Sequence, residues 1–374
     1  MDKNRRNFIK KALTISALAI SGSSILPSCH GIKRANTPYK YSSLIPEIDR
    51  IKSKILYYAS LAPSGHNSQP WYVKILSKKD WIICTDPKRR LPSVDPKNRE
   101  MILSIGAFME NLSIAAASYG FEVNDQIIAK DTFDEEILKI SLNKINPVDY
   151  PLERITKRMT AKNGYKSKEL KNEDVKFLSE PLNNHLFYFP RNSEHGKCIE
   201  EGVIEYFKTQ TYRDDAQKEL AEWLRLTDEE ANLKKDGLTL EGMGITGIAG
   251  WYVRNFVKPS DFMNDNFRKK GIEKIAKIAG QGAGWLIITS DGETVTDLIN
   301  TGRRFERMAL IARERMIAIH PMTQYLEEDK GQKIISKNHK DGFSPQFVLR
   351  VGYISSYPDP VSLRRPVSSF VRKV

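Results

Sequence analysis

Residues 158–162, with the sequence Arg-Met-Thr-Ala-Lys, carry side chains that could bind a phosphate ester. A phosphomonoester has three acceptor oxygens and about 1.5–2 negative charges at neutral pH. Arg158 can supply a guanidinium fork and Thr160 a hydroxyl donor. In an extended stretch residues two apart share a face, so Arg158, Thr160 and Lys162 can point together. Taken alone, the same pattern also fits a solvated basic run.

A second segment, residues 62–71, reads Ala-Pro-Ser-Gly-His-Asn-Ser-Gln-Pro-Trp and is rich in turn-forming residues. This composition predicts a loop. Pro63, Ser64 and Gly65 would let the backbone approach a flat ligand closely. Asn67 offers both a donor and an acceptor. For His66, ligand contact and a structural hydrogen bond are both open.

The two segments together resemble the nitroreductase family, whose flavin-contacting loop reads Pro-Ser-Ser-x-Asn-x-Gln-Pro-Trp and whose phosphate motif is Arg-x-Ser-x-Arg or Arg-x-Ser-x-Lys. The resemblance implies FMN as cofactor and no catalytic side chain, because the flavin carries the chemistry. Gly65 and His66 depart from the commonest form of the loop. The cofactor-binding residues that the resemblance implies are Pro63, Ser64, Gly65, His66, Asn67, Gln69, Arg158, Thr160, Lys162, Met322, Thr323, Arg364 and Arg365.

Within this set the resemblance assigns different parts of FMN to different residues. Lys162 would reach the ring edge and stabilise the anionic reduced flavin. A basic residue near the C-terminus, either Arg364 or Arg365, would meet the phosphate. Met322 and Thr323 stand where the family presents backbone to the flavin.

The order of the two segments is unusual for the family. In ordinary nitroreductases the phosphate motif comes first, and each FMN lies between two subunits. Here the loop comes first and Arg158 follows far along the chain, a layout that resembles the Acg-like branch. This implies one FMN per chain and an internal pseudo-dimer in a monomeric chain. The implied fold class is α+β, with two fused nitroreductase-like units, mixed and mostly antiparallel sheets flanked by helices, and long central helices at the internal interface.

The expected organisation is an export signal in residues 1–28, a tether in 29–45, a first half in 46–150 and a second half in 151–374. A lid insertion is expected at about 236–262, where the glycine-rich stretch Gly237–Trp251 resembles the lid of Acg-like proteins. An ordinary surface loop is the alternative there.

Hydrophobic spacing predicts the elements that must position these segments. Helices are expected over 45–61, 102–119, 203–225 and 296–319, and strands over 71–76, 81–85, 284–290 and 346–353. The helix over 102–119 is apolar on nearly all sides and should be buried. Placing Gly106 on Gly302 aligns the two long helices as a weak internal repeat. Two buried helices can also look alike without a common origin.

The first thirty residues predict export. Arg5-Arg6 followed by Asn-Phe-Ile-Lys resembles a twin-arginine signal, and Leu26-Pro27-Ser28-Cys29 resembles a lipoprotein cleavage site. The expected location is the periplasm or a membrane surface, with lipidated Cys29 as the tether. Ordinary cleavage nearby, with no lipid, is the alternative.

Composition and charge exclude several further classes of protein. The 374 residues are 40% hydrophobic and 28% charged, as in globular proteins, and three cysteines are too few for a disulfide framework or a cysteine-built metal site. The histidines show no metal-ligand spacing. The net charge of +13 comes from Lys and Arg scattered among acids, without a nucleic-acid motif, so no nucleic-acid partner is expected.

The expected function is an FMN-dependent oxidoreductase that reduces a small electron-poor acceptor of the nitroaromatic or quinone class. The electron donor is unknown, because NAD(P)H is a cytoplasmic metabolite and an exported protein would need another reductant. The alternative is an exported FMN-binding or storage protein with a closed lid and little NAD(P)H turnover. A basic surface-anchored binding protein without cofactor is a third hypothesis.

Overall fold

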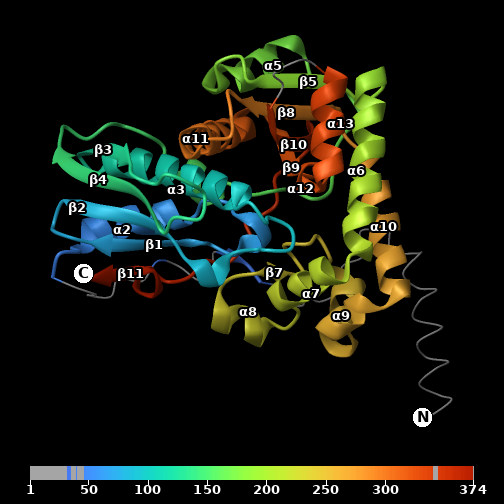
Figure 1. The fold of residues 1–374 in the computed structure, drawn as a ribbon, viewed down its shortest axis with the longest axis horizontal. Helices are drawn as coiled ribbons and strands as arrows, with labels where there is room; N and C mark the ends of the chain where they lie inside the picture. Colours follow the sequence, from blue (N-terminus) through green and yellow to red (C-terminus); the bar gives the residue numbers. More distant parts are fainter. Residues whose placement is uncertain (1–31, 35–38, 40–45, 340–343, 374) are drawn as a thin grey trace.

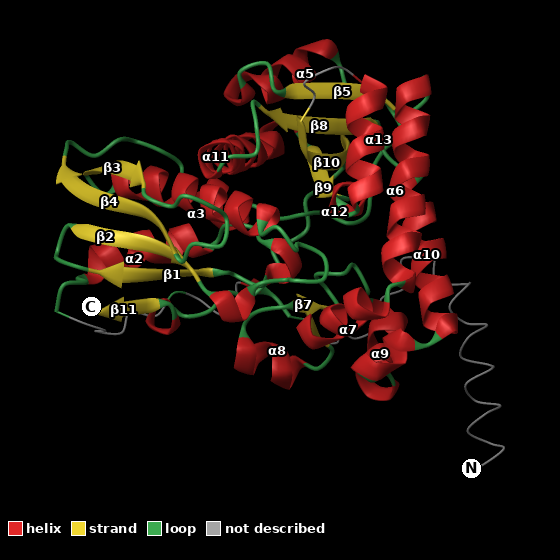
Figure 2. Cartoon of the chain, in the orientation of Figure 1, coloured by secondary structure: helices red, strands yellow, loops and turns green. Residues whose placement is uncertain are grey.

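The computed structural model describes residues 32–34, 39, 46–339 and 344–373. The fold is α+β, with two large and mostly antiparallel sheets flanked by helices (Figure 1, Figure 2). This confirms the expected fold class. The predicted export signal and Cys29 lie outside the described residues.

The first sheet is built almost entirely from the N-terminal part of the chain. Its elements are α2 (Arg50–Ser60), β1 (Trp71–Ile75), β2 (Asp80–Thr85), α3 (Arg99–Ser118), β3 (Phe121–Ile127) and β4 (Glu136–Lys144). The strands lie in the order β1-β2-β4-β3, and each neighbouring pair is antiparallel. One further strand, β11 (Val371–Lys373), comes from the far end of the chain and pairs parallel with β1.

The second sheet repeats this arrangement. Its elements are α4 (Glu153–Lys157), α5 (Asn172–Ser179), β5 (Leu186–Pro190), β8 (Gly284–Ser290), α11 (Val295–Ala312), β9 (Ile317–Pro321) and β10 (Ser344–Tyr353). The strand order β5-β8-β10-β9 is again antiparallel throughout. Along the chain, each sheet is therefore formed by two strands, a long helix and two more strands, apart from the added strand β11. The corresponding strands lie in the same spatial order in the two sheets.

A long segment between β5 and β8 has no counterpart in the first sheet. It contains α6 (Glu194–Tyr212), α7 (Asp214–Trp223), β6 (Leu224–Arg225), α8 (Asp228–Lys234), β7 (Leu238–Thr239), α9 (Gly247–Phe256) and α10 (Asp265–Ala279). Figure 1 shows α7, α8 and α9 at one end of the molecule, with α6 and α10 beside the second sheet. Two further helices, α12 (Gln324–Glu327) and α13 (Asp329–His339), follow β9.

Three sequence predictions about these elements were wrong in part. The helix expected over 203–225 is two helices, because Arg213 has an extended backbone between them. The helix expected over 296–319 ends at Ala312, after which left-handed Met316 turns the chain into β9. The apolar run of β9 continued the helical pattern in sequence, although its residues pair with β10. The glycine-rich stretch is not wholly irregular, because Gly247 begins α9.

The two long helices, α3 and α11, meet at a pair of glycines. A methyl group on Gly302 would lie 2.1 Å from the carbonyl oxygen of Leu103, and one on Gly106 would lie 2.3 Å from that of Ile299. Only glycine permits this backbone contact. α3 is long and apolar enough to cross a membrane, but 78% of its apolar window is buried, as expected for a core helix.

Two polar contacts flank the glycine pair, and they are related to each other in the same way as Gly106 and Gly302. Nδ2 of Asn111 donates to Oε1 of Glu306 at 3.1 Å, and Nε of Arg307 donates to Oε1 of Glu110 at 2.8 Å. The alignment of Gly106 with Gly302 also places Glu110 on Glu306 and Asn111 on Arg307. It therefore exchanges one contact for the other, as in a two-fold symmetric interface.

We predict that Gly302→Ala destabilises the protein by about 1–3 kcal/mol, because the new methyl group must push the two helix backbones apart. Denaturant unfolding would measure the change. Gly271→Ala in α10 is the matched control, since no atom lies within 4 Å of its added methyl group. The control should be neutral or slightly stabilising through helix propensity. Equal stability of the two variants would contradict the backbone contact.

Candidate functional site

The loop of residues 62–70 is fixed by a segment from the other end of the chain. Oδ1 of Asn67 accepts a hydrogen bond from Nη1 of Arg364 at 2.9 Å. The Asn67 amide nitrogen donates to the carbonyl oxygens of Gly237 at 3.1 Å and Leu363 at 3.3 Å. Arg364 also donates to the carbonyl of Ala62 at 3.0 Å. The side chain of Asn67 is thus held by two distant segments.

Hydrogen bonds between Gln69 and Arg365 form a second connection to the same loop. Oε1 of Gln69 accepts from the backbone nitrogen of Arg365 at 2.9 Å, and its amide nitrogen donates to the carbonyl of Lys235 at 2.9 Å. The Arg365 guanidinium donates to the carbonyls of Gln69 and Trp71. Arg365 therefore holds the loop, whereas Arg364 holds the loop and also lies near Arg158.

The backbone of this loop is unusual. His66, Asn67 and Gln69 have φ angles of 48°, 51° and 52°, a left-handed conformation that few residues other than glycine adopt. Such conformations are often found in ligand-binding loops. Oγ of Ser64 supports the turn by accepting from the backbone nitrogen of Gln69 at 2.9 Å. Pro63 precedes it and is half-buried.

Two further features of this loop concern His66 and Gly65. Nδ1 of His66 is buried without a hydrogen-bond partner among the described residues. Burial lowers the pKa of His66 to about 4, so its ring is neutral. A methyl group on Gly65 would lie 3.4 Å from Oε2 of Glu100 and 3.1 Å from Leu91, so a side chain here would crowd both.

Arg158 lies in a buried cluster of charged side chains. Its Nε is 3.3 Å from Oε2 of Glu306, and the two side chains are 7% and 0% exposed. Burial raises the pKa of Glu306, and Arg158 opposes that shift. Burial, followed by repulsion from Arg34 and Arg158, holds the pKa of Arg364 well below its usual value. Arg34, Arg158 and Arg364 thus lie near the carboxylate of Glu306, on which the buried Glu110 also acts.

The chemistry of this cluster fits a bound phosphate. Nε of Arg364 is buried without a hydrogen-bond partner among the described residues, whereas Nε of Arg158 and Oε2 of Glu306 face each other at 3.3 Å as an ion pair. Among the described residues, the Arg158 guanidinium forms an ion pair with Glu306 and no other ion pair. A buried excess of positive charge is costly unless an anion compensates it.

A small hollow opens beside Arg158. It is lined by Met159, Thr160 and Tyr357 among others, and its free space of about 10 Å³ holds no more than one water molecule. A phosphate group could enter only if side chains at the rim rotate. Thr160 lines the same hollow as Arg158, and its role in binding a phosphate stays a prediction.

The amine of Lys162 contacts a buried histidine. Its Nζ is 2.7 Å from Nε2 of His320, while Nδ1 of His320 is 3.2 Å from a terminal nitrogen of Arg350. Burial, then repulsion from Lys162, Arg350 and Lys274, keeps the pKa of His320 well below its usual value. His320 is therefore neutral.

The hydrogen bonds of this trio determine where the protons lie. Arg350 can only donate, so Nδ1 of His320 accepts and Nε2 carries the proton. Nζ of Lys162 must then accept, which requires a neutral amine. Burial, then repulsion from Arg350 and Lys274, lowers the pKa of Lys162 to about 7, in agreement with this assignment.

Met322 and Thr323 directly follow the end of β9. The Met322 side chain is buried in the core of the second sheet, and its backbone nitrogen donates to the carbonyl of Val348 at 2.8 Å. The Thr323 hydroxyl donates to Oε1 of Glu327 at 3.0 Å. Both residues thus make contacts within the second sheet and its helices, and their assignment to the flavin site stays a prediction.

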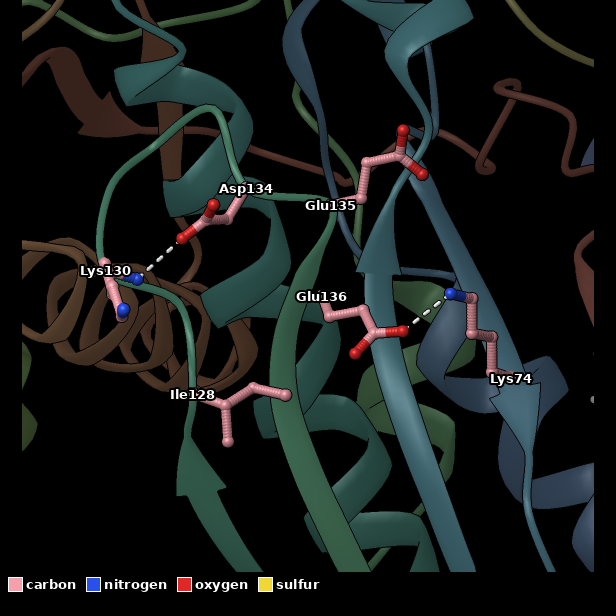
Figure 3. Close-up of a pocket in the computed structure, with 6 residues that line it drawn as sticks. All are labelled: Lys74, Ile128, Lys130, Asp134, Glu135 and Glu136. Carbon is pink, nitrogen blue, oxygen red and sulfur yellow. Dashed lines mark hydrogen bonds and ion pairs between the residues drawn. The ribbon is translucent and has the colours of Figure 1, made fainter.

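A wider hollow lies elsewhere on the surface. It measures about 450 Å³ and is lined by Lys74, Ile128, Lys130, Asp134, Glu135 and Glu136 (Figure 3). Nζ of Lys74 pairs with Oε1 of Glu136 at 2.6 Å, and the backbone nitrogen of Lys130 donates to Oδ2 of Asp134. It contains no predicted site residue, so we regard it as a surface depression.

Four residues of these clusters were absent from the predicted site: Arg34, Glu306, His320 and Arg350. A charged residue on the apolar face of the 296–319 helix was a usable signal for Glu306. Arg34 gave no signal, because it lies in a segment that resembled a tether.

Comparisons with known proteins agree with the nitroreductase resemblance. No family model matches the chain. Proteins from two strains of Mycobacterium tuberculosis, provisionally named NAD(P)H nitroreductases, are 25% identical over 89% of this chain and 94% of their own length. A Serratia protein provisionally named NAD(P)H nitroreductase PigM is 21% identical over 79% of this chain and 86% of its own. These similarities support the nitroreductase family and a nitroreductase-type oxidoreductase.

We predict that Lys162→Met flattens the rise of stability with pH. The folded pKa of about 7 lies below the ordinary value of 10.5, so the unfolded chain binds more protons between these values. The penalty for burying this group is full below pH 7 and falls as pH rises, by about 2 kcal/mol between pH 7 and 9. Denaturant unfolding at pH 7, 8 and 9 would measure the difference.

Lys168→Met serves as the control for this experiment, because Lys168 is exposed. It should keep the wild-type slope. If Lys162→Met also keeps that slope, the neutral amine and the proton assignment of the trio are wrong.

Proposed function

We propose that the chain binds one FMN and acts as a nitroreductase-type oxidoreductase on a small electron-poor acceptor, such as a nitroaromatic compound or a quinone. One observation carries the proposal. The loop of residues 62–70 and the Arg158 segment, far apart in sequence, meet at one buried arginine cluster through Arg364. The names of the relatives give independent support for the oxidoreductase class.

The residues of the cluster would hold the cofactor by its phosphate. Arg158 and Thr160 would bind the phosphate oxygens, with Arg364 adding charge from behind. A bound flavin would supply the hydride chemistry, for which no protein acid or base is required. Lys162 could take up a proton near neutral pH, because burial, then repulsion from Arg350 and Lys274, lowers the pKa of its amine to about 7.

We further propose that the chain is an internal dimer of the Acg-like type. The two sheets share one strand order, and the helix contacts exchange under the Gly106–Gly302 alignment. The parallel pairing of β11 with β1 supports the same interpretation, since the end of the second unit then completes the sheet of the first. One shared site per chain follows from this arrangement.

A storage role is the second candidate, and the contacts of the insertion favour it. The carbonyl of Lys235 and both backbone groups of Gly237 bind the loop of residues 62–70. A methyl group on Gly244 would lie 3.0 Å from Cβ of Lys162. We call residues 235–245 the covering segment. It packs on both halves of the proposed site, which would restrict acceptors to small molecules or delay turnover.

Export remains part of the proposal. A twin-arginine signal would carry the folded chain with its cofactor, and a lipid on Cys29 would keep it at a membrane. In that location the electron donor is open, although the relatives' names refer to NAD(P)H.

We predict that the purified chain is yellow and contains one FMN per chain, and that Arg158→Ala weakens FMN affinity about 10–100-fold. The loss corresponds to one charged hydrogen bond of about 1.5–3 kcal/mol. Absorbance spectra and flavin fluorescence titration would measure both quantities. Arg154→Ala is the matched control, because Arg154 lies in α4 and pairs with Glu314 at the surface.

The control should bind FMN like the wild type. A colourless protein that takes up no FMN would overturn the proposed function. Equal affinity of the wild type and Arg158→Ala would remove Arg158 from the site.

Catalysis and storage differ in their response to the covering segment. We predict that wild-type protein oxidises NAD(P)H slowly with a nitroaromatic acceptor, and that replacing the covering segment, residues 235–245, by a short Gly-Ser linker raises the rate at least about tenfold. Circular dichroism and FMN content would verify that the variant is folded. Brisk turnover by the wild type would contradict storage, and no turnover by either protein would contradict the oxidoreductase.

A further inference from the structure

The helix α9 carries three large apolar side chains that are exposed to solvent. Ile248, Trp251 and Phe256 are 54%, 46% and 51% exposed. Ile248 and Trp251 are three residues apart, so they are neighbours on the helix surface. The rings of Trp251 and Phe256 lie 5.5 Å apart. Exposed apolar side chains that gather on one element mark an interaction surface.

The opposite side of α9 is fixed to the folded body. Tyr252 and Val253 pack against a small buried cluster that includes Leu240. Nε of Arg254 pairs with Oδ1 of Asp228 in α8 at 2.9 Å. The helix therefore cannot turn its three exposed side chains inward without losing these contacts, and their exposure is a property of the folded chain.

The surroundings of α9 are basic. Residues 243–260 contain Arg254 and Lys258 and no acidic residue, and residues 243–279, which include α10, contain seven basic and three acidic residues. The start of α10 lies beside α9, because its Phe267 packs against the same buried cluster as Tyr252. Lys258 and Lys270 are both exposed. Aromatic and aliphatic side chains among basic residues are typical of helices that lie on anionic lipid.

The N-terminal part of the described chain reaches the same end of the molecule. Ile32 is buried against Ala231 of α8 and against Leu363. Figure 1 shows α8 and α9 together at this end. Leu233 of α8 is 80% exposed, more than any other large apolar side chain of the described residues. Ile32 follows Cys29 by three positions, which span at most about 11 Å. A lipid on Cys29 would thus hold this end near a bilayer.

We propose that α9 is a membrane-docking surface, on which Ile248, Trp251 and Phe256 enter the interfacial layer of an anionic bilayer while neighbouring lysines contact lipid phosphates. The inference goes beyond the proposed function, because it uses the proposed lipid on Cys29 as support but requires no bound flavin. α9 directly follows the covering segment. Docking would therefore place the cover of the proposed site at the membrane surface.

Tryptophan fluorescence can report this docking at a single residue. Trp71, Trp81 and Trp285 are buried and Trp223 is half-buried, so Trp251 is the most exposed of the five tryptophans. Full-length protein would be mixed with saturating phosphatidylglycerol vesicles whose acyl chains carry bromine, a short-range quencher, with unbrominated vesicles as the reference. We expect quenching in the wild type and at least about fivefold less in Trp251→Phe, because the aromatic anchor remains but the inserted indole is gone.

A charge on the same face should prevent the docking. We expect Ile248→Asp to reduce quenching at least about fivefold, because a carboxylate is costly in the interfacial layer. Ile334→Asp is the matched control, since Ile334 is 42% exposed and lies in α13, away from α9 (Figure 1). It should quench like the wild type. Lys258→Glu should reduce quenching at least about twofold through repulsion from anionic lipid, and Lys168→Glu, at another exposed lysine, should not.

Several results would overturn the inference. The first is a wild type without quenching, and the second is an equal loss in Ile248→Asp and Ile334→Asp. Unchanged quenching in Lys258→Glu would remove the role of anionic lipid. Sedimentation velocity without vesicles tests the other occupant of this surface: a dimer that Ile248→Asp dissociates would assign the surface to a second copy of the chain.

If circular dichroism shows that Ile248→Asp does not fold, Ile248→Ser decides, and unchanged quenching in that variant overturns the inference. None of these readouts needs a flavin. A colourless protein whose Trp251 is quenched would therefore contradict the proposed function and leave the docking surface standing. A yellow protein without quenching would do the reverse.

Discussion

The backbone contact between α3 and α11 at Gly106 and Gly302 is the constraint on which the proposed site depends. Glu306 follows Gly302 by one helical turn, so it lies on the same face of α11 and points into the interface. There it accepts from Asn111 and pairs with Arg158. A larger residue at either glycine would separate the helices and move Glu306 away from the motif that it anchors.

From Glu306 the interactions continue outward to the loop of residues 62–70. Arg364 shares the cluster with Arg158 and donates to Asn67 and to the carbonyls of Leu61 and Ala62. The loop thus depends on the same arginines that would bind a phosphate. An anion that relieves repulsion within the cluster would also steady the loop, which couples phosphate binding to the geometry of the proposed ring site.

The elements with strong local patterns could be predicted from the sequence, and those set by distant contacts could not. β8 matches its prediction at both ends, because its apolar run is buried on both faces and is followed by turn residues. The helix over 296–319 was extended too far, because Ile317 and Ile319 fit a helical repeat as well as an edge of the sheet. The Arg158 motif was visible through residue types alone. Arg34 was not, because it is held by the carbonyls of Thr156, Arg158 and Ser362, which no local pattern reveals.

The contacts of the covering segment set how often the proposed site would open to a substrate. Three hydrogen bonds join Lys235 and Gly237 to the loop: one from the Gln69 side chain, one from the Asn67 side chain and one from the Gly237 backbone nitrogen. At about 1 kcal/mol net for each bond, opening costs roughly 3 kcal/mol, which leaves the open form at about 1%. The ion pair between Arg89 and Asp236, at 2.9 Å, adds to this cost. Under the proposed function, a site open about 1% of the time would retain a cofactor for long periods and would still admit small acceptors at a reduced rate. Storage and slow reduction would then be two consequences of one closing equilibrium, with the strength of these few contacts setting the balance between them.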